Sequence, residues 1–282
     1  MALQAQHEAS DATADTAPAE PFLLEDLRGN VLWLTLNRPG QRNPLSSGMI
    51  AALRAAMAGA ADNPAVRVVV ISGAGSMFSA GHDLREMQRQ AGESPEAHRQ
   101  RVRQVLDDCA SMMLGIVHSP KAVIARVHGT ATAAGLQLVS ACDLAIADEQ
   151  TRFCTPGVNI GAFCTTPLVG VGRNVLRKHA LELALTGDMF GADDALRFGL
   201  VNKVVAAGEL AGEVEQLAEK IASRSAQAIR LGKEAFYRQV EMPLEEAFKY
   251  ATEAMLAGLM AADAAEGTSA FLGKRKPVWG EA

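Results

Sequence analysis

The sequence has few of the features that mark secreted, metal-binding or nucleic-acid-binding proteins. Its 282 residues include only four cysteines, and none of them forms a Cys-x-x-Cys pair. This excludes a disulfide framework and gives no indication of a zinc site. Asp and Glu (32) outnumber Lys and Arg (27), so the chain lacks the basic excess of a nucleic-acid binder. We therefore interpret the cysteines as reduced thiols and predict neither a metal nor a nucleic acid partner.

The N-terminal stretch lacks cations. Residues 1–21 are rich in Ala, Thr, Asp, Glu and Pro, and they contain no Lys or Arg and no apolar periodicity. This composition predicts a disordered tail. The missing cations count against a signal peptide and against a mitochondrial presequence, so the sequence predicts a cytoplasmic protein.

Charged residues are also missing from 153–172. A run of about 20 uncharged residues is long enough to span a bilayer. This one contains Pro156 and Pro167, several glycines and three threonines, which make a poor lipid-facing helix. We expect a buried wall of a site rather than a membrane span.

Strand and helix patterns alternate over the first two thirds of the chain. Apolar β-branched runs predict strands, and helical patterns follow them until only helices remain. The sequence thus predicts a disordered tail (1–21), an α/β core (22–205) and a helical region (206–282). The expected strands are 31–36, 66–72, 122–127 and 144–147, and the expected helices are 46–61, 98–117, 133–141, 180–185, 192–198, 210–223, 226–239, 244–260 and 264–272.

Two stretches of small residues each lie between a predicted strand and a predicted helix. The first is SMFSAGHDL (76–84), where Asp83 and Glu86 resemble a capping box, and the second is HGTATAAGLQ (128–137). Each leaves the first amide N–H groups of a helix without helical partners. If the turns converge, two main-chain donors can bind one oxygen atom, as in an oxyanion hole. The alternative is two ordinary helix starts, which are common.

Six words of the sequence resemble the enoyl-CoA hydratase/isomerase (crotonase) superfamily, from about Leu24 to the C-terminus. They are LTLNRP (34–39), FSAGHDL (78–84), CDLAIA (142–147), LTGD (185–188), GLVNKVV (199–205) and AFLGKRKPVW (270–279). The words SAGHDL, ATAAGLQLVSACD, TPGVNIGAFCTTP and KRKPVW are similar to one subgroup, the enoyl-CoA hydratase domain-containing protein 3 subgroup.

This resemblance implies an α/β fold of the crotonase type, a spiral of ββα units followed by a helical C-terminal region for trimerisation. It implies a homotrimer, or a hexamer built as a dimer of trimers. It also implies a lyase or isomerase of fatty acid metabolism that acts on an acyl-CoA thioester and needs no other cofactor.

In this superfamily the thioester oxygen lies between two main-chain amides, which by position are the N–H groups of His82 and Ala134. Cations at the phosphates of CoA would make charge-assisted contacts, and Arg42 and Lys274 are the candidates. Solvated surface charge is the alternative for both. The residues expected to contact the CoA thioester are Arg42, Ala80, His82, Asp83, Leu84, Arg85, Gly135 and Lys274.

The two catalytic glutamates of standard hydratases have no counterpart here. The resemblance places them at Gln137 and Gly157. No Asp or Glu occurs between Asp108 and Asp143, or between Glu149 and Glu182, so a shifted alignment does not recover either carboxylate. Each acid–base group contributes roughly 10²–10⁴ in rate, and a hydratase without both would be very slow.

Few side chains could replace these carboxylates. The His82 imidazole titrates near neutrality and could act as a base, or only its main chain is used and the ring packs. Asp83 is interpreted as a helix cap. A thiolate of Cys154 or Cys164 could form an acyl intermediate, although neither has an obvious neighbouring base. The residues expected along the acyl pocket are Met87, Asn159, Phe163, Thr165, Thr166 and Leu168.

Three functions remain open at this point. The first is an enzyme that polarises an acyl-CoA carbonyl for hydration, isomerisation or thioester hydrolysis. The second is an acyl-CoA-binding protein that has lost its acid and base. The third is a scaffold that uses only its oligomeric surface. The resemblance favours the first.

Overall fold

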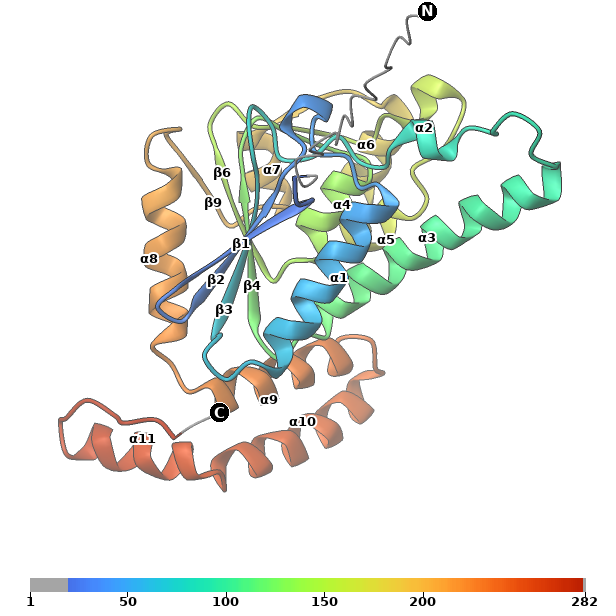
Figure 1. The fold of residues 1–282 in the computed structure, drawn as a ribbon. Coiled ribbons are helices and arrows are strands. Elements are labelled where there is room, and N and C mark those ends of the chain that lie inside the picture. Colours follow the sequence, from blue (N-terminus) through green and yellow to red (C-terminus); the bar gives the residue numbers. More distant parts are fainter. Residues whose placement is uncertain (1–19, 281–282) are drawn as a thin grey trace, which may run out of the picture.

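The computed structural model describes residues 20–280. Almost all of the predicted tail (1–21) therefore lies outside the described residues. Figure 1 shows a central sheet with helices on both of its faces and a separate layer of helices below it. Among the described residues, no helix is both long enough and apolar enough to cross a membrane.

A six-stranded sheet forms the centre, with strand order β1-β2-β3-β4-β6-β9. β1 pairs antiparallel with β2, and all other neighbours in this sheet are parallel. Its strands are β1 (Leu23–Arg28), β2 (Val31–Leu36), β3 (Val68–Gly73), β4 (Ala122–Val127), β6 (Leu144–Asp148) and β9 (Lys203–Val205).

A second, smaller sheet continues from the end of β4. It has the order β5-β7-β8 and consists of β5 (Thr130–Thr132), β7 (Arg152–Cys154) and β8 (Phe190–Gly191). Because β5 directly precedes α4, this sheet fixes where that helix begins.

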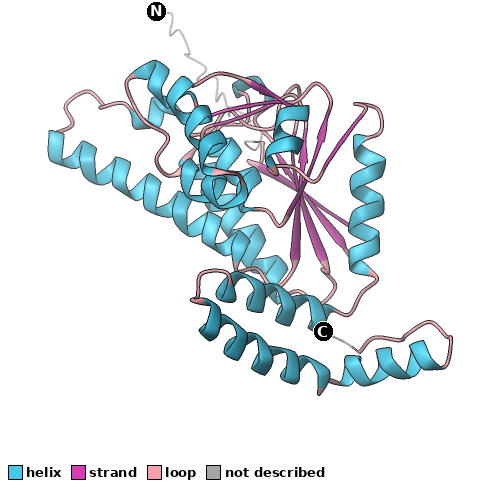
Figure 2. Cartoon of the chain, turned by 180° about the vertical axis from the view of Figure 1, so that it is seen from behind, coloured by secondary structure: helices cyan, strands magenta, loops and turns pink. Residues whose placement is uncertain are grey.

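Alternating apolar residues give the large sheet two buried faces. Val68 and Val70 of β3 pack on one face of the sheet, whereas Val69 and Ile71 pack on the opposite face. On the first face lies α8 (Leu210–Ala222), and on the second lie α1 (Ser47–Asp62), α3 (Pro95–Val117) and α4 (Ala134–Ala141). Figure 2 shows the same two-sided arrangement from behind.

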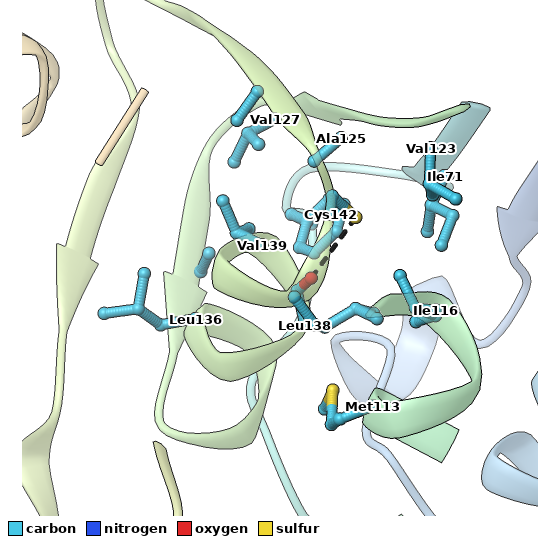
Figure 3. Packing of buried hydrophobic residues seen from close by; sticks show 14 of the residues in the cluster. Ile71, Met113, Ile116, Val123, Ala125, Val127, Leu136, Leu138, Val139 and Cys142 are labelled. Carbon is cyan, nitrogen blue, oxygen red and sulfur yellow. Dashed lines mark hydrogen bonds between the residues drawn. The ribbon is translucent and has the colours of Figure 1, made fainter. Parts of the chain in front are cut away.

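α4 is buried almost all round. Leu136, Leu138 and Val139 pack among strand residues and against Met113 and Ile116 of α3 (Figure 3). A helix that is apolar on every side belongs in the interior. Its first residue, Ala134, is therefore held in place by the core.

Further short helices lie between the elements already described. They are η1 (Pro39–Gln41), α2 (Leu84–Met87), η2 (Pro156–Ile160), α5 (Pro167–Asn174), α6 (Arg177–Thr186) and α7 (Ala192–Phe198). α5 packs on α4, where Asn174 Nδ2 donates to the carbonyl oxygens of Ser140 (3.0 Å) and Gly170 (2.9 Å).

The lower layer consists of α9 (Ala226–Gln239), α10 (Leu244–Leu259) and α11 (Ala262–Leu272). A partly buried ion pair ties α9 to the core, because Lys233 Nζ lies 2.7 Å from the Asp143 carboxylate and also donates to the Ile116 and Lys121 carbonyls. Tyr237 donates to the same carboxylate at 2.9 Å. α10 and α11 extend beyond this anchor.

Several sequence predictions match the structure closely. The strands predicted at 31–36 and 122–127, and the helices predicted at 192–198 and 226–239, have the observed bounds. The strands β1, β5, β7, β8 and β9 were not predicted. The proposed division at residue 206 stays a prediction, and α8, which follows it, packs on the sheet.

Of the capping box predicted at Asp83 and Glu86, the Asp83 cap is present and the Glu86 contact is wrong. Asp83 caps α2 by accepting a hydrogen bond from the Arg85 amide at 2.9 Å. The Glu86 side chain does not accept a hydrogen bond from the Asp83 amide. It accepts hydrogen bonds from the amide and the hydroxyl of Ser47 (2.8 Å each), at the start of α1. A tertiary partner has replaced the local one.

Candidate functional site

The first turn runs from Ser79 to Asp83 and leads into α2. Gly81 has a φ of +85°, a conformation that glycine adopts at little cost. The turn lies beside the main chain of 42–45, since the Ala80 amide donates to the Arg42 carbonyl (2.9 Å) and the Leu45 amide donates to the Gly81 carbonyl (2.8 Å).

The second turn joins β5 to α4 through Ala133. This residue has φ +49° and ψ −118°, a region that non-glycine residues rarely occupy. Its side chain cannot cap α4, and no other side chain does so. The first amides of the helix are consequently left without helical partners.

The two turns are joined by main-chain hydrogen bonds. The Ser79 amide donates to the Thr130 carbonyl (3.2 Å), and the Thr132 amide donates back to the Ser79 carbonyl (3.0 Å). Thr132 Oγ1 donates to the Ala80 carbonyl at 2.9 Å. A methyl group on Gly81 would lie 3.0 Å from the Ala134 nitrogen, so the turns touch at this point.

Two amides at this contact have no partner. Within residues 20–280, neither the N–H of His82 nor that of Ala134 donates a hydrogen bond, whereas their neighbours Gly81 and Ala133 donate to Ser79 Oγ (3.2 Å) and the Cys154 carbonyl (3.0 Å). The structure thus brings the two predicted turns together. It leaves the two amides that the resemblance singled out as donors without partners.

Three buried side-chain atoms near these amides also lack partners. They are His82 Nε2, Gln137 Oε1 and Thr155 Oγ1. Gln137 lies one turn into α4, and Thr155 directly follows β7, which pairs with β5. Unpartnered polar atoms in an interior are uncommon and call for an explanation such as a bound ligand or water. Nothing in the sequence pattern singles out Thr155 as a site residue.

Gly157 lies at the start of η2 and is buried. A methyl group there would lie 3.0 Å from Cys164 Sγ and 3.1 Å from the Ala162 carbonyl oxygen. The sulfur of Cys164 therefore occupies space beside the position where the resemblance places a glutamate. A larger side chain at 157 requires the 162–164 segment to shift.

The cysteines are buried and free, and their surroundings disfavour thiolates. Burial raises the pKa of Cys154 to about 11. Burial also raises the pKa of Cys164, although the Gly157 N–H partly opposes the shift. A thiol with a raised pKa is a poor nucleophile at neutral pH. Neither cysteine therefore fits an acyl acceptor well.

His82 and Asp83 differ in their environment. Burial lowers the pKa of the His82 imidazole, and the charge of Glu86 opposes that shift only in part. The ring is thus neutral at neutral pH. A hydrogen bond from Arg85 lowers the pKa of Asp83, and the two side chains form an ion pair at 3.1 Å. The side chains of Leu84 and Arg85 are exposed.

The two predicted phosphate-binding cations, Arg42 and Lys274, lie far apart in the structure. Arg42 is exposed and its carbonyl supports Ala80 in the first turn. Lys274 is exposed and follows α11, in the lower layer of helices, away from α2 (Figure 1). One copy of the chain does not bring Lys274 to the two turns.

Gly135 is buried against Ser79, with no room for a methyl group.

The predicted acyl-pocket residues are only partly buried. Met87 and Leu168 pack against the core, whereas Phe163 is 44% exposed. Asn159, Thr165 and Thr166 are exposed as well, so the uncharged stretch 153–172 is not a continuous buried wall. Within residues 20–280, no three His, Cys, Asp or Glu side chains gather as metal ligands would.

Comparisons with known proteins extend this description. The family model described as enoyl-CoA hydratase/isomerase matches residues 26–282. The mitochondrial enoyl-CoA hydratase domain-containing protein 3 of Xenopus laevis is 45% identical over 246 residues, which cover 87% of this chain and 82% of that protein. The human protein of the same name is 43% identical, with 87% and 79% covered.

Solved structures show the same fold. A Mycobacterium smegmatis enoyl-CoA hydratase is 46% identical, with a TM-score of 0.86 over 92% of this chain and 99% of that one. Human enoyl-CoA hydratase domain-containing protein 3 is 41% identical, with a TM-score of 0.87 over 92% and 100%. The predicted crotonase-type α/β fold and the predicted subgroup are confirmed.

The predicted cytoplasmic location is contradicted. Relatives from Xenopus laevis, mouse, human and zebrafish are all named mitochondrial proteins. The cytoplasmic prediction rested only on the lack of Lys and Arg in residues 1–21.

Proposed function

Because this chain belongs to the enoyl-CoA hydratase/isomerase family, we propose that it binds an acyl-CoA thioester and polarises the carbonyl between two main-chain amides. The donors are the N–H groups of His82 and Ala134. The observation that supports this most directly is that both amides lack partners at the contact between the two turns. Donors fixed in advance stabilise negative charge on an oxygen without reorganising.

The chemistry of such a site is the stabilisation of an enolate or of a tetrahedral oxyanion. Gly81 leaves room for the ligand oxygen because it has no side chain at the contact. Gln137 and Thr155 then offer neutral hydrogen-bonding groups to a water molecule or to the acyl group. The neutral His82 imidazole lies on the residue that carries the first amide, and it is the candidate base.

A second candidate is an acyl-CoA-binding protein without turnover. It is favoured by Gln137 and Gly157, since neither residue can donate or accept a proton near neutral pH. Thioester hydrolysis through a cysteine is less well supported, because burial raises the pKa of both Cys154 and Cys164.

We place the CoA portion along the outer side of the first turn. Arg42 and Arg85 are exposed there, near Ala80 and Asp83, and Arg85 also approaches Gln41. Lys274 would reach the phosphates only from a neighbouring copy of the chain, because it lies in the lower layer of its own chain.

The lower layer supports a homotrimer, or a hexamer built from two trimers. Large apolar side chains are exposed on it, including Phe248 (68%), Met260 (75%) and Phe271 (82%). A cavity of about 670 Å³ between α9, α10 and α11 has a mostly apolar lining. Exposed apolar patches of this kind mark interaction sites. Sedimentation velocity of the intact protein should show an assembly of three or six chains, and a monomer would contradict it.

The experiment that tests the amide pair removes one donor. Ala134→Pro deletes the N–H, and proline is tolerated at the first position of a helix. Because proline also restricts the residue before it, the variant is made in an Ala133→Gly background and compared with Ala133→Gly alone. We expect crotonyl-CoA turnover to fall by about 10²–10³. Unchanged turnover would contradict the site.

A second experiment separates the two candidates. Gln137→Glu combined with Gly157→Glu restores both carboxylates, and Cys164→Ala is added to relieve the contact at 3.0 Å. Hydratase activity that rises by at least about 10² would show that only the acid–base groups are missing. A variant that binds butyryl-CoA and stays inert would favour the binding protein.

A further inference from the structure

Arg42 and Asn43 adopt left-handed backbone conformations one after the other, with φ of 65° and 48°. Left-handed residues are uncommon outside glycine, although asparagine tolerates them better than most. Asn43 is fully buried, which is unusual for an amide side chain in a loop. This turn therefore needs strong tertiary support.

The Asn43 side chain provides that support. Its Oδ1 accepts a hydrogen bond from the Arg38 amide at 2.9 Å. Its Nδ2 donates to the carbonyl oxygens of Ala74 (2.8 Å) and Met77 (2.9 Å). Both N–H bonds of the amide are used, and the side chain joins the 38–43 turn to the loop that follows β3.

The main chain of residues 38–43 forms hydrogen bonds with the first turn of the site. Ser79 Oγ donates to the Asn43 carbonyl at 2.8 Å and accepts from the Gly81 amide at 3.2 Å. The Arg42 carbonyl accepts from the Ala80 amide. An unbroken series of hydrogen bonds thus runs from Asn43 to the residue before His82.

One further bond sets the direction of the His82 N–H. The Gly81 carbonyl accepts from the Leu45 amide at 2.8 Å, two residues after Asn43. In a trans peptide the C=O and the following N–H point in opposite directions. Since the C=O points toward Leu45, the N–H of His82 points away from the 42–45 segment.

From this arrangement we infer that Asn43 is a positioning residue for the first amide donor. It fixes the 42–45 segment, and that segment orients the Gly81–His82 peptide. The inference rests on the proposed function, because the amide matters only if it binds the thioester oxygen. It goes beyond that function because it assigns the orientation of the His82 N–H to the side chain of Asn43, which does not touch the ligand.

The test compares butyryl-CoA with free CoA, which lacks the thioester oxygen. Asn43→Asp keeps the shape and the acceptor and loses both N–H donors. Ser79→Ala removes only the relay hydroxyl, and it decides the matter if Asn43→Asp does not fold. Calorimetry on the intact protein should show butyryl-CoA affinity falling by roughly tenfold more than CoA affinity in each variant, the size of one hydrogen bond.

Asn174→Asp, at an exposed asparagine, is the control. The Asn174 amide also donates to two carbonyl oxygens, but at the end of α5 and without a link to the first turn. It should leave the ratio of the two affinities unchanged. The inference is overturned if Asn43→Asp and Ser79→Ala keep the ratio of the unaltered protein, or if they weaken both ligands equally. Equal affinities in the unaltered protein would overturn the proposed function, and the inference with it.

Discussion

The two turns of the candidate site present their amides by opposite means. In the first turn Gly81 adopts a positive φ without strain, and the 42–45 segment holds it from outside. In the second turn Ala133 occupies a glycine-like conformation with a side chain present, and the buried α4 holds it. One turn is conformationally relaxed and sterically tight, and the other is strained and has room for its methyl group.

The missing side chain at Gly81 and the methyl group of Ala133 are linked, because the two positions are in contact. A methyl group on Gly81 would lie 3.0 Å from the Cβ of Ala133 and 2.9 Å from the Thr132 carbonyl oxygen. One methyl group fits at the contact, but two do not. Gly81 thus leaves the space that the methyl group of Ala133 occupies.

Gly81→Ala should have the largest effect on this comparison. The variant combines an unfavourable φ, which costs about 1–3 kcal/mol, with a group placed 3.0 Å from the Ala134 nitrogen. We expect a lower free energy of unfolding and a loss of butyryl-CoA affinity of roughly tenfold to a hundredfold. Chemical denaturation and calorimetry measure the two quantities.

Gly92→Ala controls for the backbone term. Gly92 has a φ of +76° and nothing within 4 Å of the added methyl group, so it carries the strain without the contact. It should lose stability and keep its affinity for butyryl-CoA. If Gly81→Ala behaves in the same way, the turns do not meet around a ligand.

Ala133→Gly should have a smaller effect of opposite sign. It relieves a strained conformation worth about 1–3 kcal/mol and gives back about 0.5–1 kcal/mol in unfolded-chain entropy. We expect a net gain of about 1 kcal/mol in the free energy of unfolding. Ala55→Gly, at an exposed position inside α1, should instead lose about 1 kcal/mol. Equal losses at both positions would show that Ala133 is not strained.

The smallest effect concerns pH, since only the first turn carries a titratable side chain. Burial lowers the pKa of His82, so between that value and its ordinary value near 6.5 the unfolded chain binds more protons than the folded one. Stability should therefore fall as the pH drops below about 6.5, and His82→Gln should reduce this dependence. Thermal unfolding from pH 7 to 5 measures it.

Ala133→Gly, which changes no titratable group, is the control for that experiment. It should shift the stability by a constant amount across the pH range. A His82→Gln variant with the slope of the unaltered protein would show that the imidazole is not shielded from water in the folded state.

The main parts of the fold and the two turns could be predicted from the sequence. The strands at 31–36 and 122–127 are short, mostly apolar runs of six residues, and local pattern is enough to identify them. The small residues before two helices indicated the two turns but left two ordinary helix starts as the alternative, and the choice of His82 and Ala134 as donors came from the family resemblance. β5, β7 and β8 have only two or three residues each, which is too short for an alternating pattern to stand out.

The support of the site was beyond local sequence patterns. Asn43 reads as an ordinary turn residue, and its role depends on carbonyl groups more than 30 positions away. The positive φ of Ala133 accompanies main-chain hydrogen bonds to Cys154 of β7 and Gln137 of α4, and the alanine itself gives no sign of it in the sequence. Glu86 was assigned a local partner although Ser47 binds it across the fold.

Isotope-edited infrared spectroscopy of butyryl-CoA with a ¹³C-labelled carbonyl directly tests whether the amides of His82 and Ala134 bind one thioester oxygen, because hydrogen bonds to the oxygen lower the C=O stretching frequency. We expect a lower frequency in the complex than in free butyryl-CoA, and a partial return in the Ala133→Gly/Ala134→Pro variant. A bound thioester that vibrates at the frequency of the free molecule would contradict it.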